Sequence, residues 1–396
     1  MMFATLPWQL PADLPWQVLT SPLDQWDRLP SFLIGEYLFI ALAGLALWHA
    51  QRNGRAHVFV WVAAIMAGTA NDVIFMALPL VDNFWQAQAT IMLTPRLPLY
   101  IPCVYVCFMY LPTVAVWRLG LNRWSGAALT GLAAIVFYAP YDIVGAKFLW
   151  WTWHDTDAPI AARILGAPIG STVWVITFAA TFAWLIRWTV DKDPEVRARS
   201  FALGLLKVGL LSSFVMVLQM TVLQQLDGGV PGPLTLVGVV VIYLGLTVWG
   251  ARTAQRSTHW VHDRILAGAI TAYFAVLILV TAVFSPQTHR SQSLHQTYGP
   301  CHVEATDITG ATRFQYVCAQ DYEEDYTFDC AGPPAEMSEW YTVCGRPYTN
   351  KPAWLAGVGG LGVLGAALYL FLLLGTQRRP SHEPDAPGES GHPPPA

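Results

Sequence analysis

The stretch ILAGAITAYFAVLILVTAVFS, residues 265–285, carries no charged side chain and directly follows Arg264. It contains 21 residues, and a helix that crosses the apolar core of a bilayer needs about 20 mostly apolar residues. Lipid offers no water to the backbone, so such a segment must satisfy its own N–H and C=O groups as a helix. The stretch therefore predicts a transmembrane helix.

Eight further runs have the same apolar character, at residues 31–50, 58–80, 98–117, 125–146, 166–186, 201–226, 234–250 and 354–375. The chain of 396 residues is 54% hydrophobic and only 12% charged, whereas soluble domains carry about 25% charged residues. This composition disfavours a soluble enzyme and a disordered protein, and the net charge of −4 gives no basic surface for nucleic acid. We predict an all-α, polytopic bundle of about nine transmembrane helices.

Lysine and arginine predict the orientation of this bundle. Thirteen of them fall in one set of short loops and four in the other, and cytoplasmic loops carry the excess. The N-terminus is therefore expected outside the cytoplasm and the C-terminus inside. No span combines a preceding basic stretch with a following small-residue cleavage site, so we expect no cleaved signal peptide.

The cysteines test this orientation independently. Cys301, Cys318, Cys330 and Cys344 all lie between residues 286 and 353, in the long loop that the charge count places outside. Disulfides persist in oxidising compartments, so the two arguments agree. Disulfide bonds are expected among these four cysteines, with all three pairings open.

These patterns divide the chain into five predicted parts. They are an extracytoplasmic Trp/Pro-rich interfacial segment (1–30), an eight-span bundle (31–285), an extracytoplasmic Cys-containing loop domain (286–353), a ninth span (354–375) and a disordered cytoplasmic tail (376–396). We expect the cell membrane as the location, and a bacterial inner membrane rather than a eukaryotic one.

A faint repeat relates two pairs of predicted helices. In each pair, an aspartate near the end of one span is followed by tryptophan in the outer loop, then by arginine and by proline. The residues are Asp72, Trp85, Arg96 and Pro98 in the first pair, and Asp142, Trp151, Trp153, Arg163 and Pro168 in the second. Both pairs run in the same direction, so a parallel duplication and a chance match are both open.

Ionisable groups inside spans are costly and tend to be functional. Four occur here: Glu36, Asp72, Asp142 and Lys207. Lys207 lies near a cytoplasmic end, where its amine can reach the interface. The three carboxylates lie in the outer halves of their spans, so we expect the buried polar groups to be concentrated there. His49, His57, His259 and His262 fall at the cytoplasmic side and are interpreted as interfacial or solvated.

The segment from residue 141 to 174, YDIVGAKFLWWTWHDTDAPIAARILGAPIGSTVW, combines acids, a histidine and tryptophans at one outer helix end. Such a set suits acid–base catalysis in a low-dielectric pocket. A metal site is a weaker interpretation, because the segment lacks the paired-histidine spacing of such sites. A third interpretation is a purely structural one, in which the tryptophans form an aromatic belt and the charged residues anchor helix ends. We predict no metal and no cofactor. The candidate catalytic residues are Asp142, His154, Asp155, Asp157 and Asp72, and the candidate substrate-binding residues are Trp150, Trp151, Trp153, Arg163 and Glu36.

The stretch from Asp142 to Ser171, with WWTWHDTD at residues 150–157, resembles the signature of a polytopic membrane-protein family of unknown function. The Cys-bearing stretch YGPC…GATRFQYVCAQDYEEDYTFDC, residues 298–330, is similar to the outer loop of that family. A fainter similarity, through residues 166–168 (GAP) and Trp174, points to membrane proteins of the carotenoid-hydratase type. That second resemblance implies acid-catalysed chemistry on a double bond of an isoprenoid or other lipid.

The sequence thus predicts an integral membrane protein whose outward-facing acidic, His- and Trp-bearing pocket binds or modifies a lipid or isoprenoid. Whether it is an enzyme stays open at this point. Two alternatives are a small-molecule transporter and a receptor or assembly factor that acts through the outer loop. The expected partners are membrane lipids and a lipid or isoprenoid substrate, with no nucleic acid.

Overall fold

The computed structural model describes residues 16–78, 84–153, 158–253, 262–294, 296–307, 310, 312–318 and 326–375. Within these residues, nine helices are long and apolar enough to cross a membrane. The predicted all-α polytopic fold is therefore confirmed. The predicted tail, 376–396, lies outside the described residues.

Eight of these helices are continuous. They are α2 (Pro30–Asn53), α3 (Arg55–Ala77), α6 (Arg123–Lys147), α8 (Ile169–Val190), α9 (Ala198–Leu223), α10 (Pro233–Thr253), α11 (Arg264–Val283) and α12 (Lys351–Leu374). A short helix, α1 (Pro22–Arg28), precedes them, and the Ser21 side chain caps its first turn.

The third span is broken into three parts: α4 (Tyr100–Tyr105), a π-helical turn η1 (Val106–Tyr110) and α5 (Leu111–Trp117). Pro112 at the start of α5 explains the break, because it has no N–H and its ring crowds the carbonyl four residues earlier. The Thr113 hydroxyl donates to the Met109 carbonyl at 2.6 Å and so satisfies one acceptor in the widened turn. π-Turns inside helices often mark functional sites.

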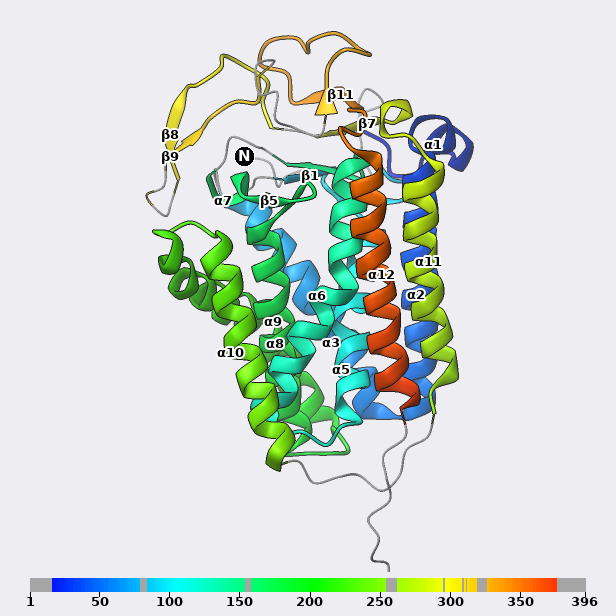
Figure 1. The fold of residues 1–396 in the computed structure, drawn as a ribbon, viewed down its shortest axis with the longest axis vertical. Coiled ribbons are helices and arrows are strands. Elements are labelled where there is room, and N and C mark those ends of the chain that lie inside the picture. The colour runs from blue at the N-terminus through cyan, green and yellow to red at the C-terminus, as the bar shows by residue number, and fades with distance from the viewer. Residues whose placement is uncertain are drawn as a thin grey trace, which may run out of the picture.

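Helix α6 lies at the centre of the bundle and packs against α8, α10 and α12 (Figure 1). Its Phe137 ring stacks on Tyr273 of α11 with centroids 4.1 Å apart. The hydroxyls of Tyr273 and Tyr369 donate to carbonyls of α6 at 2.9 Å, so these phenols are buried without losing hydrogen bonds. In contrast, α9 and α10 expose large apolar side chains such as Leu210 and Val241, as helices facing lipid do.

Short strands close the bundle at the end that carries the disulfides. Strand β1 (Phe84–Gln86) pairs antiparallel with β4 (Trp151–Trp153). Two hairpins lie beside them: β2 (Met92–Thr94) with β3 (Leu97–Pro98), and β5 (Arg163–Ile164) with β6 (Ala167–Pro168). A single turn of helix, α7 (Ala158–Ala161), precedes the second hairpin.

The two sequence repeats have the same order of elements. Each has a long helix with the aspartate five residues before its end, then a strand, a hairpin and another helix, and the second repeat adds the single turn α7 before its hairpin. Asp72 lies 26 residues before Pro98, and Asp142 lies 26 residues before Pro168. Both prolines end the second strand of a hairpin, and the strands β1 and β4 of the two repeats pair with each other. This shared order supports the duplication.

The disulfide-bearing region is small and strand-rich. It contains η3 (Pro286–Thr288), a sheet of β10 (Tyr326–Thr327), β11 (Trp340–Gly345) and β7 (Arg290–Leu294), and a hairpin of β8 (Glu304–Thr306) with β9 (Thr312–Phe314). The disulfides join Cys301 to Cys318 and Cys330 to Cys344. The structure thus confirms disulfides in this loop and selects one of the three pairings.

This region is bonded to the helix bundle rather than loosely attached. The Gln88 N–H donates to the Gln292 carbonyl at 2.7 Å. His289, which is fully buried, lies 2.8 Å from the Ser31 hydroxyl of α2 through its Nε2 atom. The strands lie at one end of the bundle, and the turn between α2 and α3 lies at the other (Figure 1). We call these the outer and inner ends.

Candidate outer cavity

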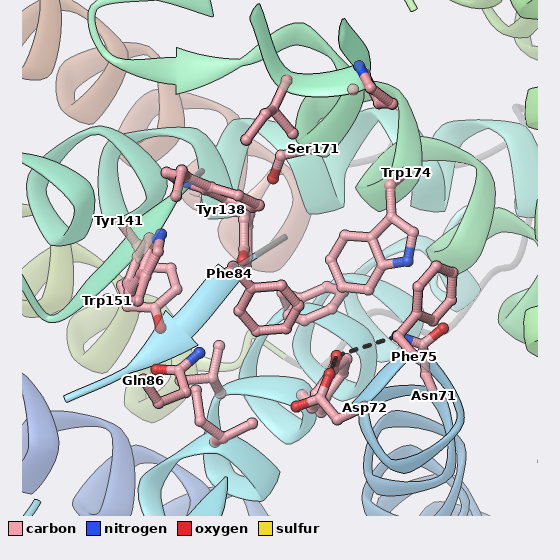
Figure 2. A pocket seen from close by; sticks show the side chains of 18 of the residues that line it. Asn71, Asp72, Phe75, Phe84, Gln86, Tyr138, Tyr141, Trp151, Ser171 and Trp174 are labelled. Atoms are coloured by element: carbon pink, nitrogen blue, oxygen red, sulfur yellow. Dashed lines mark hydrogen bonds between the residues drawn. The ribbon is translucent and has the colours of Figure 1, made fainter. Parts of the chain in front are cut away.

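A cavity of about 210 Å³ lies at the outer end, between α3, α4, α6 and α8 and beside strands β1 and β4 (Figure 2). Its lining is dominated by aromatic rings. They are Phe75, Phe84, Tyr105, Phe108, Tyr138, Tyr141, Trp151, Trp153 and Trp174. Such a lining favours an apolar ligand, and its ring faces can also attract a positive charge.

One wall of the cavity carries a buried hydrogen-bond chain. The Tyr105 hydroxyl donates to Oδ1 of Asp72, and the Asn71 amide lies 3.4 Å from the same hydroxyl. The Ser213 hydroxyl of α9 donates to Asn71 Oδ1 at 3.0 Å. Asp72 and Asn71 both line the cavity, so a carboxyl group that is only 3% exposed faces an aromatic interior.

A glycine makes this arrangement possible. Gly68 lies one helical turn before Asp72, and a Cβ atom at this position would overlap the Tyr105 ring. Because glycine has no Cβ, α4 can approach α3 closely enough for the Tyr105 hydroxyl to meet the carboxylate. The pairing of Asp72 with Tyr105 therefore depends on the absence of a side chain at Gly68.

Asp142 does not line the cavity itself, although its neighbour Tyr141 does. Its carboxylate is 1% exposed, and neither oxygen has a hydrogen-bond partner among the described residues. The Ser171 hydroxyl and the Arg163 guanidinium are the polar groups that act on it, and Ser171 lines the cavity (Figure 2). A buried carboxylate whose oxygens accept no hydrogen bond of normal geometry is costly, which keeps Asp142 a functional candidate.

The three predicted tryptophans do not all line the cavity. Trp151 and Trp153 are two residues apart on β4, so they share one face of the strand and both line the cavity. Their indole N–H groups have no hydrogen-bond partner among the described residues. Trp150 points elsewhere and donates to the Ser31 hydroxyl at 3.0 Å.

Glu36 and Arg163 do not line the cavity, and their contacts hold loops in place. The Glu36 carboxylate accepts the Thr90 N–H at 3.1 Å, the Thr90 hydroxyl at 2.5 Å and the Ile91 N–H at 3.4 Å. Arg163 donates to the Ile160 carbonyl at 3.0 Å beside the second hairpin. Their predicted contact with a substrate stays a prediction.

His154, Asp155 and Asp157 lie outside the described residues, so the cluster predicted for them stays a prediction. Within the part of the chain that is described, no three His, Cys, Asp or Glu side chains are grouped to hold a metal ion.

Sequence reasoning missed two features of the buried polar groups. Arg313 of β9 lines the outer cavity and pairs with Asp307 at 2.7 Å, so the disulfide-bearing region forms part of the wall. The predicted concentration of buried polar groups at the outer end also leaves out a smaller cluster at the inner end. At the inner end, His49 lies 2.7 Å from Asp263 and 2.7 Å from the Tyr110 hydroxyl. These partners are far apart in the sequence, so no local spacing indicates them.

The model of a family described as Domain of unknown function (DUF7802) matches residues 16–373. The chain belongs to this family. None of the curated proteins and none of the solved structures matches it. The DUF7802 match runs from before α1 to the end of α12, so the outer cavity and the disulfide-bearing region belong to one family unit. Membership in a family of unknown function is confirmed, while the similarity to carotenoid hydratases stays a prediction.

Proposed function

We propose that the outer cavity binds one end of an apolar, unsaturated lipid of the isoprenoid kind, and that Asp72 acts on it as an acid. The observation that carries this proposal is the Asp72–Tyr105 pair in a cavity otherwise lined by aromatic rings. A water-soluble polar ligand would leave most of this lining unmatched. An apolar ligand would bury it, at about 25 cal/mol for each Å² removed from water.

The same lining suits acid chemistry on a carbon–carbon double bond. The protonated carboxyl group of Asp72 would transfer its proton to one carbon of the double bond. The carboxyl O–H bond and the π bond break, one C–H bond forms, and a carbocation is left beside the Asp72 carboxylate. The faces of rings such as Trp174 and Phe108 would stabilise that cation, since aromatic faces attract positive charge within about 6 Å. Addition of water would then return one proton to the carboxylate, and the net reaction would be hydration. Loss of a neighbouring proton to the carboxylate would instead give an isomer.

The size of the cavity limits the ligand. About 210 Å³ is below the roughly 300–1,000 Å³ of typical small-molecule sites. The cavity would therefore enclose the reacting end of a long chain, while the remainder lies among the apolar side chains of the bundle surface. This size argument and the resemblance to carotenoid hydratases point to the same class of substrate.

The predicted alternatives find less support. Arg313 lies in the cavity wall, which favours a role for the outer region in the cavity over a separate receptor function. Apart from the N–H and O–H groups of its aromatic rings, the outer cavity has few polar lining groups: Asn71, Asp72, Gln86, Ser171 and Arg313. This small set favours an apolar ligand over the polar cargo of a small-molecule transporter.

Mass spectrometry of the lipids that co-purify with the protein tests binding. We expect the native chain to retain an apolar lipid, Ser171→Phe to lose it because the new ring fills the cavity, and Asp72→Asn to keep it. Leu210→Phe, on an exposed position of α9, is the matched control and should behave as the native chain does. Equal lipid retention by the native chain and by a folded Ser171→Phe variant would refute the assignment of this cavity.

A further inference from the structure

A second cavity, of about 620 Å³, lies at the inner end of the bundle. The end of α2, the start of α3, the end of α5, the start of α11 and the end of α12 surround it. It is larger than the outer cavity, and the proposed function uses none of its residues.

The lining of this inner cavity is rich in positive charge. Arg52, Arg118 and Arg264 line it, and Asp263 is the one carboxylate among its described lining residues. The Asp263 carboxylate is already engaged, by His49 Nε2 at 2.7 Å and by the Leu266 N–H at 3.0 Å. Among the described lining residues, three arginines therefore accompany one carboxylate.

These contacts also affect the pKa of Asp263. Burial alone would raise the pKa of Asp263, but the hydrogen bonds from His49 and the Leu266 N–H, with Arg118 nearby, lower it below its ordinary value. Burial also lowers the pKa of Arg118, against the attraction of Asp263. A second anion in the cavity would favour the charged guanidinium further.

Several donors are positioned to meet such an anion. The Arg52 guanidinium lies over the Trp48 ring, 4.8 Å from its centroid, which restricts its orientation. The buried Nδ1 atom of His57 has no hydrogen-bond partner among the described residues. His49 is different, because its Nδ1 atom is already 2.7 Å from the Tyr110 hydroxyl. Both ring nitrogens of His49 are therefore engaged, and this histidine holds Asp263 in place.

We propose that the inner cavity binds a phosphate group through Arg52, Arg118 and Arg264, with His57 as an additional hydrogen-bonding group. Guanidinium groups bind phosphate oxygens in pairs through charge-assisted hydrogen bonds, and arginine suits this geometry better than lysine. Trp48 and Ile265 give the cavity an apolar side as well. The phosphate can belong to a lipid headgroup or to a soluble molecule, and the experiment separates these sources.

The test uses the full chain in nanodiscs of phosphatidylcholine, with or without phosphatidic acid. Native mass spectrometry reads bound phosphatidic acid, and the thermal unfolding midpoint reads inorganic phosphate. We expect Arg52→Gln with Arg118→Gln to weaken binding of the phosphate-bearing probe by at least about tenfold. Arg197→Gln removes a charge from the same end at a side chain that is 77% exposed and outside the cavity, and should leave binding unchanged.

Each outcome decides the proposal. Selective retention of phosphatidic acid supports a lipid source, and stabilisation by inorganic phosphate supports a soluble one, provided that the double variant loses the effect. Equal binding by the double variant and the native chain overturns the proposal, and so does an equal loss in Arg197→Gln. Should the double variant fail to fold, Arg264→Gln alters an exposed side chain of the same cavity and must weaken binding several-fold.

Discussion

Asp72 shows how a single donor can hold a carboxyl group in an apolar wall. The Tyr105 hydroxyl reaches it from α4, and Asn71 and Ser213 extend the chain of hydrogen bonds to α9. In a low-dielectric interior each of these bonds is strengthened, and the loss of one leaves a costly buried group. The chemistry of the outer cavity therefore depends on Tyr105 as directly as on Asp72.

Tyr105→Phe should destabilise the protein by about 1–3 kcal/mol, because it leaves a buried acceptor on Asp72 without its donor. It should also abolish the reaction proposed for Asp72. Chemical denaturation in detergent measures the first effect. Tyr37→Phe, at a side chain that is 45% exposed, is the control and should change stability by less than about 0.5 kcal/mol. A Tyr105→Phe protein as stable as the native one would show that this hydrogen bond does not stabilise the fold.

We expect the contact that His289 makes between the disulfide-bearing region and the helix bundle to be sensitive to acid. The His289 ring is buried, with Nε2 beside the Ser31 hydroxyl and Nδ1 3.0 Å from the Ser285 carbonyl. Burial lowers the pKa of His289 from 6.5 to about 4. The folded chain therefore keeps this histidine neutral, whereas the unfolded chain protonates it below about pH 6.5. Its contribution to stability is complete above that pH and is lost as the pH falls towards about 4.

We expect this group to remove about 2 kcal/mol of stability between about pH 7 and about pH 5. Thermal unfolding of the native chain and of His289→Gln at both values isolates the effect, and the variant should show the weaker pH dependence. His302→Asn, at an exposed histidine of the same region, should keep the native dependence. Identical pH dependence in the native chain and His289→Gln would show that this ring does not titrate on unfolding.

The sequence identified Glu36, Asp72 and Asp142 as candidate functional residues because each is an ionisable group within an apolar run. It could not separate their roles, since the partner of each comes from a distant segment. Glu36 meets Thr90, Asp72 meets Tyr105, and neither oxygen of Asp142 has a partner among the described residues. Trp150 and Trp151 are adjacent, yet the first bonds Ser31 and the second lines the cavity. Such differences arise from packing between elements and leave no local pattern.

At the scale of elements, the outer cavity depends on two features: the close approach of α3 and α4, and the hydrogen bonds that hold the segment between β1 and β2. Gly68 brings α4 against α3, and Glu36 of α2 holds the backbone between β1 and β2. The order of these elements recurs around Asp142. The repeat was readable in the sequence because aspartate, arginine and proline recur in order. The strand pairs were not, because strands of two or three residues are too short for an alternating pattern.

Gly68→Ala should displace the Tyr105 ring and separate its hydroxyl from Asp72. We expect a loss of about 1–3 kcal/mol in stability from the overpacking, together with loss of function. Gly44→Ala is the matched control within α2, since a Cβ there meets no atom within 4 Å. It should be neutral or stabilise the helix by up to about 1 kcal/mol. Equal thermal stability and equal activity in the two variants would contradict the close approach.

Glu36→Ala should release the segment that follows β1. It leaves the buried Thr90 N–H without an acceptor, at about 1–3 kcal/mol. Glu36→Gln keeps one carbonyl acceptor and should cost less. Limited proteolysis of the folded protein checks the prediction, with faster cleavage between residues 84 and 99 in Glu36→Ala than in Glu36→Gln. Equal protection of this segment in both variants would argue against a clasping role.

At the scale of the whole molecule, the chain has two cavities of different chemistry at opposite ends. The outer one is aromatic with buried carboxyl groups, and the inner one is rich in arginine. Composition and apolar runs were sufficient to predict nine spans, because lipid imposes a length and a hydropathy on every helix. They could not predict the cavities. Arg313 reaches the outer cavity from β9, and Asp263 reaches the inner one from the start of α11, so both positions depend on the folded chain as a whole.

The central claim is that the outer cavity changes a lipid by acid chemistry through Asp72. Untargeted mass spectrometry of membrane lipids and pigments tests it most directly, in cells that express the native chain, Asp72→Asn, Asp142→Asn or no protein. We predict a lipid whose mass or isomeric form changes with the native chain and not with Asp72→Asn, although both accumulate equally in the membrane. An identical lipid profile with and without abundant native protein, or an undiminished change with Asp72→Asn, would contradict the claim.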